Sequence, residues 1–361
     1  MARLGDYVRI RTGKLDANAS SENGQYPFFT CAVEPLRIDS FSYDCECVLV
    51  AGNGDLNVKY YNGKFDAYQR TYIIESLDKS ILSVPYLYCF LEEYVETLRL
   101  QSIGGVIKYI KLGNLTEAPI PLPSLDEQER IVEQCEHAKK LLSLRKQQLA
   151  KLDELVKSRF IELFGDVTSN PNGYPVKNFE EISVLITDGE HATPHRTEEG
   201  IYLLSARNVL NHALQLEDVD YIDEEEYSRI ARRVIPQAGD VLISCSGSIG
   251  RCCVVPNGLR FQMVRSAALI RFDNTINPVF AEWLITSDDL QQQIAQSATQ
   301  SSQANLFQGK IRKLHGYVPP IELQEQFAAF VEQTDKSKLV VQQSIDQLET
   351  LKKSLMQKYF G

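Results

Sequence analysis

The residues best suited to chemistry include two histidines beside a glutamate. His191 and His195 are four residues apart, and Glu190 directly precedes the first. On a helix this spacing would place both imidazoles on one face, as in a zinc site. Pro194 lies between them and is incompatible with a regular helix. We therefore interpret these side chains as polar loop residues and not as a metal pair.

A serine in a small-residue stretch is the second candidate. Ser246 begins the run Ser-Gly-Ser-Ile-Gly, which does not match the GxSxG arrangement of an exposed nucleophile and is typical of a tight turn. Residues 247–252 lack the lysine of a phosphate-binding loop, and residues 52–54 lack the third glycine of a dinucleotide fingerprint. Residues 170–172 (Asn-Pro-Asn) are not the Asn/Asp-Pro-Pro-aromatic run that an amino-methyltransferase would need.

The eight cysteines contain no CxxC pair, so we expect reduced thiols in or near the core and no zinc site. No motif found in the chain supplies a cofactor loop or an activated nucleophile. The sequence therefore predicts that the chain is not an enzyme by itself.

Two stretches that begin with proline organise the rest of the chain. Residues 123–165 and 319–361 align without a gap at an offset of 196 (319 − 123). A gapless match of this length indicates a duplicated element. The identical pairs include Pro123 and Pro319, Gln128 and Gln324, Gln147 and Gln343, Leu152 and Leu348, and Gly165 and Gly361.

Both stretches are predicted to be long helices. In the first, Ser124 and Glu127 have the spacing of a capping box, and Gly165 is a suitable stop. Apolar residues at four-three spacing form one narrow seam on each helix, interrupted by Arg145, Lys338 and Lys352. The seam residues are Ile131, Cys135, Ala138, Leu142, Leu149, Leu152 and Val156, and then Phe327, Val331, Val341, Ile345, Leu348, Leu355 and Tyr359.

A narrow apolar stripe must be covered by another surface. Because the two seams share one register, we predict that the helices pack on each other. The alternative is that each helix lies along its own globular domain. As a helix at about 1.5 Å per residue, residues 126–163 would span roughly 57 Å. That length is sufficient to place two domains on successive turns of one face of a DNA duplex, at roughly 34 Å per turn.

The globular segments also repeat one plan. Leu4 to Gly13 parallels Phe179 to Gly189, and the apolar strand Cys47 to Ala51 parallels residues 239–244. A helix beginning at Val84 parallels one that opens at Val279. The doublet Asn62-Gly63 predicts a hairpin turn, with Asn257-Gly258 as its counterpart.

The predicted architecture is α+β, with two strand-rich globules that are each followed by a long helix. The predicted domains are residues 1–122, a helical spacer at 123–166, residues 167–318, and a second spacer at 319–361.

Composition restricts the class of protein. No apolar run reaches the ~18 residues of a membrane span, and the segment MARLGDYVRIRTGK lacks the apolar core of a signal peptide, so we expect a cytoplasmic protein. The net charge is −10, which argues against a surface coated for non-specific nucleic-acid binding. Any nucleic-acid contact therefore requires basic residues focused on one face, or cationic surface from a partner.

Over essentially its full length the chain resembles the specificity subunit of Type I restriction–modification systems. The resemblance is carried by LGDYVRIRTGKLDANAS (4–20), GQYPFFTC (24–31), GNGDLNVKYYNGKFDAYQRTY (52–72), GDVLISCSGSIGR (239–251), and PLPSLDEQERI (121–131) with its echo at Pro319. It implies two target-recognition domains, each reading one half of a split DNA sequence. It also implies helical spacers that pair as an antiparallel coiled coil with pseudo-two-fold symmetry.

The same resemblance implies partners that carry the catalysis. Two modification subunits would dock on the helices and methylate adenine N6 with S-adenosylmethionine. Restriction subunits would add an ATP-driven translocase and nuclease, with Mg expected there as well. This chain would hold no cofactor and no metal, and would contact double-stranded DNA and no membrane.

Individual DNA contacts are predicted from loop position and residue type. Arg and Asn suit base edges, whereas Ser, Lys and backbone amides suit phosphates. The alternative for each is an ordinary turn or surface residue. The predicted set is Lys14, Asp16, Asn18, Gly52, Asn53, Lys59, Lys64 and Arg70 in the first globule, and Arg207, Asn208, Ser246, Ser248 and Arg251 in the second.

The sequence leaves two alternative functions. The acidic net charge supports a coiled-coil scaffold that carries two similar protein-binding modules and contacts no nucleic acid. A methyltransferase with an Asn-Pro-Pro-Phe motif encoded beside this chain would favour the DNA-specificity function. A self-contained methyltransferase or nuclease would need a cofactor loop that the sequence lacks.

Overall fold

The structure, a computed structural model, describes residues 1–298 and 305–361. It divides into two compact units: unit 1 contains Met1–Gln148 with Val341–Gly361, and unit 2 contains Leu149–Val340. The long helices α3 (Leu125–Phe164) and α8 (Ile321–Phe360) each contribute residues to both units. In the part of the chain that the structure describes, no helix combines the length and apolarity needed to cross a membrane.

Unit 1 is built on a six-stranded sheet of order β2-β7-β5-β6-β3-β4, and a two-stranded ribbon pairs β1 with β8. Its elements are β1 (Ala2–Arg3), η1 (Leu4–Asp6), β2 (Val8–Thr12), η2 (Ala17–Ala19), β3 (Tyr26–Phe29), β4 (Leu36–Ile38), β5 (Tyr43–Ala51), β6 (Val58–Ala67), β7 (Thr71–Ser76), α1 (Val84–Gln101), α2 (Leu112–Thr116) and β8 (Pro119–Ile120).

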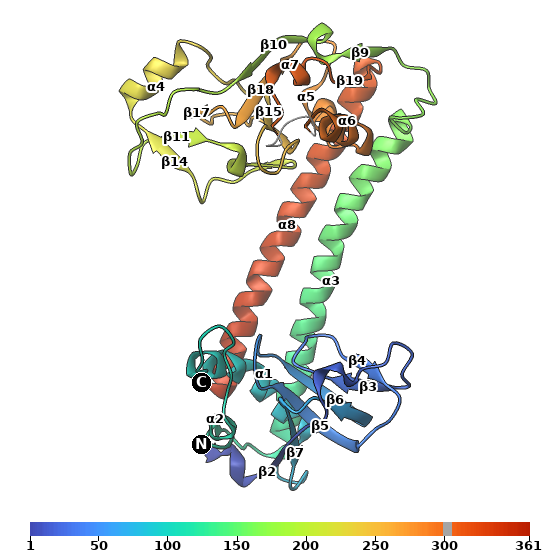
Figure 1. Cartoon of the computed structure of the whole chain (residues 1–361), viewed down its shortest axis with the longest axis vertical. Helices are drawn as coiled ribbons and strands as arrows, with labels where there is room; N and C mark the ends of the chain where they lie inside the picture. Colours follow the sequence, from blue (N-terminus) through green and yellow to red (C-terminus); the bar gives the residue numbers. More distant parts are fainter. Residues whose placement is uncertain (299–304) are drawn as a thin grey trace. The chain divides into compact units, whose positions relative to one another are not determined.

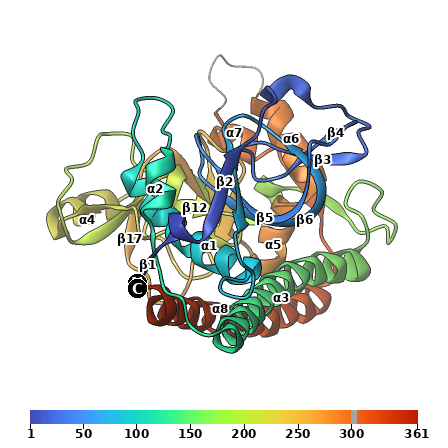
Figure 2. The same ribbon diagram turned by 90° about the horizontal axis from the view of Figure 1, so that it is seen from below.

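Both faces of this sheet are buried, which explains the continuous apolar run in β5. Val48 and Val50 point to a core that they share with α1, whereas Cys47 and Leu49 point to an aromatic cluster that contains Phe29. Successive residues of a strand face opposite sides, so a strand covered on both sides is apolar at every position. In Figure 2, α1 lies between this sheet and the long helices.

The hairpin predicted at Asn62-Gly63 is wrong. β6 continues through this doublet, and Asn62 and Gly63 pair with Glu46 and Cys45 of β5. The chain reverses earlier, between Ala51 and Val58. An unbroken antiparallel ladder along β5 thus outweighs the local turn preference of the doublet. Its counterpart, Asn257-Gly258, does form a turn, with φ of +79° at the glycine.

Unit 2 contains a four-stranded sheet of order β10-β18-β15-β16, a three-stranded sheet of order β14-β11-β17, and two ribbons, β12-β13 and β19-β9. The strands are β9 (Val176–Asn178), β10 (Ser183–Asp188), β11 (Ile201–Leu204), β12 (Val209–Leu210), β13 (Ala213–Leu214), β14 (Asp220–Ile222), β15 (Val241–Ser244), β16 (Cys252–Val254), β17 (Phe261–Met263), β18 (Ala267–Phe272) and β19 (His315–Tyr317). The helices are η3 (Phe179–Glu181), η4 (Ala206–Asn208), α4 (Glu224–Ala231), α5 (Pro278–Ile285), α6 (Asp288–Ala298) and α7 (Gln308–Ile311).

The predicted repeat of the globular plan is confirmed. In both units a short 3-10 helix precedes the first strand of the main sheet, and the leading residues, Leu4 and Phe179, are fully buried. The strand orders β2-β7-β5-β6 and β10-β18-β15-β16 correspond position by position. Alternate residues of β15 again enter two separate cores.

The predicted pairing of the long helices is confirmed (Figure 1), and the pair is antiparallel. In unit 1 the Tyr359 hydroxyl donates to Gln134 at 2.9 Å, and Lys146 lies 3.2 Å from Glu349. As residue numbers rise along α3, the partners on α8 therefore fall. Unit 2 continues the same register, because Lys338 reaches Asp153 at 2.8 Å. Lys338 interrupts the apolar seam, and this ion pair with the facing helix accommodates it.

The helices are also part of the globular cores. Ile131 and Cys135 of α3 belong to the core of unit 1. Phe160 and Phe164 of α3 pack with Phe327 of α8, at ring-centroid distances of 5.3 Å and 5.6 Å, in the core of unit 2. Within each unit the seam is thus covered both by the facing helix segment and by the core of that unit.

Two fully buried glutamines explain one of the identities between the repeats. The Gln128 amide accepts from Ser83 N at 3.0 Å and donates to the carbonyls of Ile81 and Pro123 at 2.7 Å and 3.0 Å. In unit 2, Gln324 makes the same three bonds, to Asn277 N and to the carbonyls of Thr275 and Pro319. Each glutamine thus connects the start of a long helix to the N-terminal end of the helix after the sheet.

Replacing Gln128 with leucine is expected to lower the free energy of unfolding by about 3 kcal/mol. The variant would remove three hydrogen bonds of a fully buried side chain, to Ser83 N and to the carbonyls of Ile81 and Pro123. Denaturant unfolding of the full chain measures the change. Gln147, which is exposed on the same helix, provides the matched control, since Gln147→Leu should leave the midpoint unchanged. Equal midpoints for the two variants would contradict the assignment.

Candidate nucleic-acid interface

Three loops of unit 1 meet at one end of the main sheet. They are residues 13–15 after β2, 52–57 between β5 and β6, and 68–70 before β7. Gly13 N donates to Thr71 O at 3.0 Å, Gln69 N to Leu15 O at 2.9 Å, and Gly52 N to Arg70 O at 2.8 Å. We call this group the unit 1 loop cluster.

The cluster brings together several residues of the predicted set. Lys14 is exposed on its first loop. Asp16 and Asn18 are exposed directly after it, where Asp16 accepts from Ala17 N at 2.7 Å and caps η2, and Asn18 lies within η2. Arg70 is exposed on the third loop. These side chains are free to approach a ligand from solvent.

Gly52 and Asn53, the two predicted residues of the second loop, contribute backbone hydrogen bonds. Gly52 is buried, donates to Arg70 O, and accepts from Ile110 N at 2.9 Å. Asn53 forms a β-bridge with Tyr109. Their backbone groups hold the cluster together, and only Asn53 is partly exposed.

The structure separates the two lysines of β6. Lys59 lies near the cluster, where its ammonium bonds Asn57, whose amide in turn donates to Cys31 O at 2.8 Å. Burial lowers the pKa of Lys59. Lys64 lies near the other end of β6, opposite Asp44, with its ammonium 4.7 Å from the Phe41 ring centroid. Lys64 therefore does not join the cluster.

Unit 2 contains the same construction. Gly189 N donates to Ala267 O at 3.0 Å, Arg265 N to Glu190 O at 3.0 Å, and Cys245 N to Ser266 O at 2.7 Å. The loops after β10, before β18 and between β15 and β16 thus form a unit 2 loop cluster. Ala206 N donates to Ser266 Oγ at 3.1 Å, which connects η4 to the same cluster.

The predicted residues of the loop 245–251 lie together. The buried Ser244 hydroxyl donates to Ser248 O at 2.7 Å and accepts from Arg251 N at 3.0 Å, so it fixes the shape of the loop. Ser248 is exposed, Ser246 and Arg251 are half-buried, and Ser246 forms a β-bridge with Asn305. This bridge is the counterpart of the bridge between Asn53 and Tyr109.

The two predicted residues of η4 differ in accessibility. The exposed Arg207 guanidinium lies 2.9 Å from Asp220, so an acidic side chain already neutralises it. Asn208 is fully buried. Its amide accepts from Ser205 N and donates to the carbonyls of Gln215 and Asp218, each at 2.9 Å. In this conformation the Asn208 side chain positions its loop and does not reach the surface.

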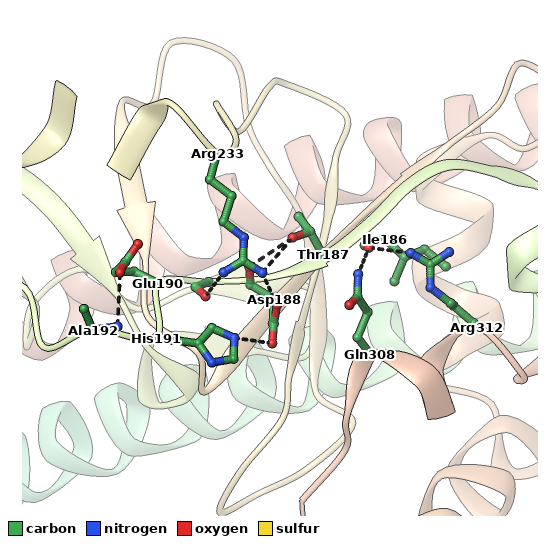
Figure 3. A network of polar contacts seen from close by, with 10 residues as sticks. Ile186, Thr187, Asp188, Glu190, His191, Ala192, Arg233, Gln308 and Arg312 are labelled. Atoms are coloured by element: carbon green, nitrogen blue, oxygen red, sulfur yellow. Dashed lines mark hydrogen bonds and ion pairs between the residues drawn. The ribbon is translucent and has the colours of Figure 1, made fainter. Parts of the chain in front are cut away.

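The loop after β10 is held by the network in Figure 3. Asp188 accepts from Arg233, and a ring nitrogen of His191 lies 2.7 Å from the same carboxylate. Burial alone would raise the pKa of Asp188, but His191 and Arg233 outweigh it and hold the pKa below its usual range. In the described residues no group of three or more His, Cys, Asp or Glu side chains could hold a metal ion.

Sequence reasoning missed Arg265, Gly13 and Gly189. Arg265 is exposed in the unit 2 cluster, where the offset of 196 pairs it with Gln69 (265 − 69). Applied to the predicted Arg70, the same offset gives Ser266, directly beside Arg265 (266 − 70). Each glycine lies where a strand end closely approaches another chain segment. An added Cβ would come within 2.1 Å of Ala67 O at Gly13, and within 2.3 Å of Met263 O at Gly189.

The arrangement suits binding of a polyanion. Exposed or partly exposed cations, Lys14 and Arg70 in unit 1 and Arg251 and Arg265 in unit 2, stand on loops whose backbones are fixed by hydrogen bonds to the sheets. Lysine and arginine on such loops can contact phosphates and base edges. The clusters are also formed from equivalent strands of two repeats, which is suited to a ligand with two similar parts.

Residues 1–154 match the family model of the Type I restriction modification DNA specificity domain. The chain is 39% identical over 154 residues to the Type I restriction enzyme EcoDI specificity subunit of Escherichia coli, a match that covers 43% of this chain and 34% of that protein. It is 20% identical over 307 residues to the EcoBI specificity subunit of Escherichia coli, which covers 76% and 64%. The matches thus span less than two thirds of these curated relatives.

Solved structures share the fold. The S subunit of the Type I restriction–modification system from M. genitalium matches with a TM-score of 0.64 at 15% identity, over 100% of this chain and 95% of that chain. A chain from a study of complex assembly and conformational transition of the type I R-M system matches with a TM-score of 0.60 at 16% identity, over 99% and 96%. These similarities confirm the predicted α+β architecture.

Proposed function

We propose that this chain, whose residues 1–154 belong to the Type I restriction–modification DNA specificity family, is the subunit that selects the DNA sequence on which its complex acts. Each loop cluster would read one half of a bipartite site. The observation that carries this proposal is the repeated hydrogen-bond pattern of the clusters. Gly13 N donates to Thr71 O at the start of β7, and Gly189 N donates to Ala267 O at the start of β18.

The long helices would set the distance between the two half-sites. α3 and α8 each run through 40 residues without interruption, and a continuous helix is a stiff spacer. Their pairing along a shared seam would resist bending of either helix alone. A fixed spacer converts two weak half-site contacts into one specific event, because both clusters must be engaged together.

Catalysis would belong to partners. We propose that two modification subunits dock on the helices and supply N6-adenine methylation with S-adenosylmethionine, and that restriction subunits supply ATP- and Mg-dependent cleavage. The chain itself would bind none of these cofactors. A complex that reads the host genome would work in the cytoplasm.

Removing the exposed cations of one cluster is expected to weaken binding of the target duplex at least tenfold. Two double variants test this, Lys14→Ala with Arg70→Ala in unit 1 and Arg251→Ala with Arg265→Ala in unit 2. If both residues of a pair contact phosphates, the slope of log affinity against log salt concentration should fall by roughly 1.8. Fluorescence anisotropy across a potassium chloride series measures both quantities on the complex of the chain with its modification subunits.

The control keeps the change in charge and moves it to the helices. Lys157 and Lys353 are exposed and occupy equivalent positions on α3 and α8, so Lys157→Ala with Lys353→Ala should leave the affinity within about twofold. If the cluster variants bind the target as this control does, the clusters are not the DNA contacts.

A further inference from the structure

An apolar loop extends from unit 1. Val106 is fully exposed, at 104% of its reference surface, and Ile107 is 63% exposed. Ile103 and Tyr109 beside them are also exposed large side chains. Large apolar side chains that are exposed side by side mark an interaction site, whereas apolar side chains exposed singly are normal on a protein surface. We call Val106 and Ile107 the apolar tip.

Backbone hydrogen bonds and one glycine define the conformation of this loop. Ile103 and Tyr109 exchange two backbone hydrogen bonds, at 3.0 Å and 2.8 Å, which close the loop at its base. Gly104 has φ of +119°, and a Cβ there would lie 2.5 Å from Ile107 O. Only glycine fits this position. The sequence therefore fixes a loop that presents the tip to solvent.

The loop continues the unit 1 loop cluster. Gly54 N donates to Lys108 O at 2.9 Å, and Ile110 N donates to Gly52 O at 2.9 Å. Lys108 and Lys111, on either side of this attachment, are exposed. An apolar tip flanked by lysines matches the chemistry of side chains that enter DNA between base pairs while cations hold the phosphates.

We infer that the apolar tip inserts between two adjacent base pairs of the half-site that unit 1 reads, and partly unstacks them. The inference rests on the proposed function and adds to it a step of DNA deformation. Unstacking is cheaper at flexible pyrimidine–purine steps, so the tip would select sequence at a position that no hydrogen bond reads. The offset of 196 places Ser302 and Gln303 opposite the tip residues in the sequence repeat, so unstacking is expected in one half-site only.

The test uses target duplexes in which 2-aminopurine replaces one adenine at a time, except the adenine that the modification subunits methylate, because methyltransferases flip that base out of the stack. This base fluoresces more strongly when it is unstacked. Binding of the complex of the full chain with its modification subunits should brighten the probe at one step in one half-site. Val106→Ser with Ile107→Ser should abolish the brightening and weaken binding about tenfold, since the contact between tip and base is lost.

The matched control is Leu77→Ser with Ile81→Ser. These exposed apolar residues follow β7 at the opposite end of the sheet. The complex that carries this control variant should bind the target and brighten the 2-aminopurine probe as the wild-type complex does. Selective binding with no brightened step, or brightening that survives the tip variant, overturns the inference and leaves the proposed function standing. Loss of the modification subunits from the tip variant, with brightening intact, would instead make the loop a protein contact and would also overturn it. A wild-type complex without sequence preference would refute the proposed function itself.

Discussion

A heptad inserted into each long helix is expected to widen the gap between the two DNA half-sites by about three base pairs. Seven residues add roughly 10.5 Å of helix, and a duplex rises about 3.4 Å per base pair. A heptad preserves the apolar seam, and it turns the helix by only about 20°. The insertions belong after Gln148 and after Val340, where the two units divide.

Binding to a set of duplexes that differ only in gap length measures the outcome. The wild-type complex should prefer one gap, and the double insertion should shift this optimum while the half-site sequences stay the same. An insertion in α3 alone is the control, because it mismatches the seam and should reduce binding at every gap. An unchanged optimum for the double insertion would show that the helices do not set the spacing.

Substituting alanine at Gly13 or Gly189 is expected to destroy recognition of one half-site. The new Cβ would come within 2.1 Å of Ala67 O or 2.3 Å of Met263 O, and backbone atoms cannot move away as a flexible side chain can. The loop must therefore leave its hydrogen bonds, at a cost of about 2–3 kcal/mol in unfolding free energy. A decrease in melting temperature should accompany the loss of discrimination in one half-site.

The repeat provides matched controls. Gly113 and Gly309 occupy equivalent positions at the offset of 196 (309 − 113), lie in the short helices α2 and α7, and have open space where a Cβ would stand. Gly113→Ala and Gly309→Ala should preserve binding and stability. Normal melting and normal discrimination in Gly13→Ala would contradict the role assigned to the close approach.

The parts of the fold that follow from local pattern could be predicted from the sequence. The four-three spacing of Ile131, Cys135 and Ala138 is sufficient to identify the seam, and the apolar run at Cys47 to Ala51 is sufficient to identify a strand covered on both faces. The duplication also transfers each assignment from one unit to the other. Gln128 and Gln324 were visible as identities, although only the structure gives their three hydrogen bonds.

The composition of the loop clusters could not be predicted in the same way. It depends on β7 lying between β2 and β5, a non-local neighbour relation. Residue type also does not reveal direction: Asn208 and Asn18 both read as polar loop residues, but only Asn208 is buried with its amide bonded to the backbone. Asn62-Gly63 shows the same limit, since strand pairing overrides its turn preference.

The most direct measurement of the central claim is sequencing of methylated bases in the host genome, with and without this chain. Each loop cluster is proposed to read half of one site for a methylating complex. Inactivation of this chain is therefore expected to abolish N6-methyladenine at a single motif, made of two short sequences separated by a fixed gap, and to leave other modified motifs unchanged. An identical pattern of methylation in both strains would contradict it.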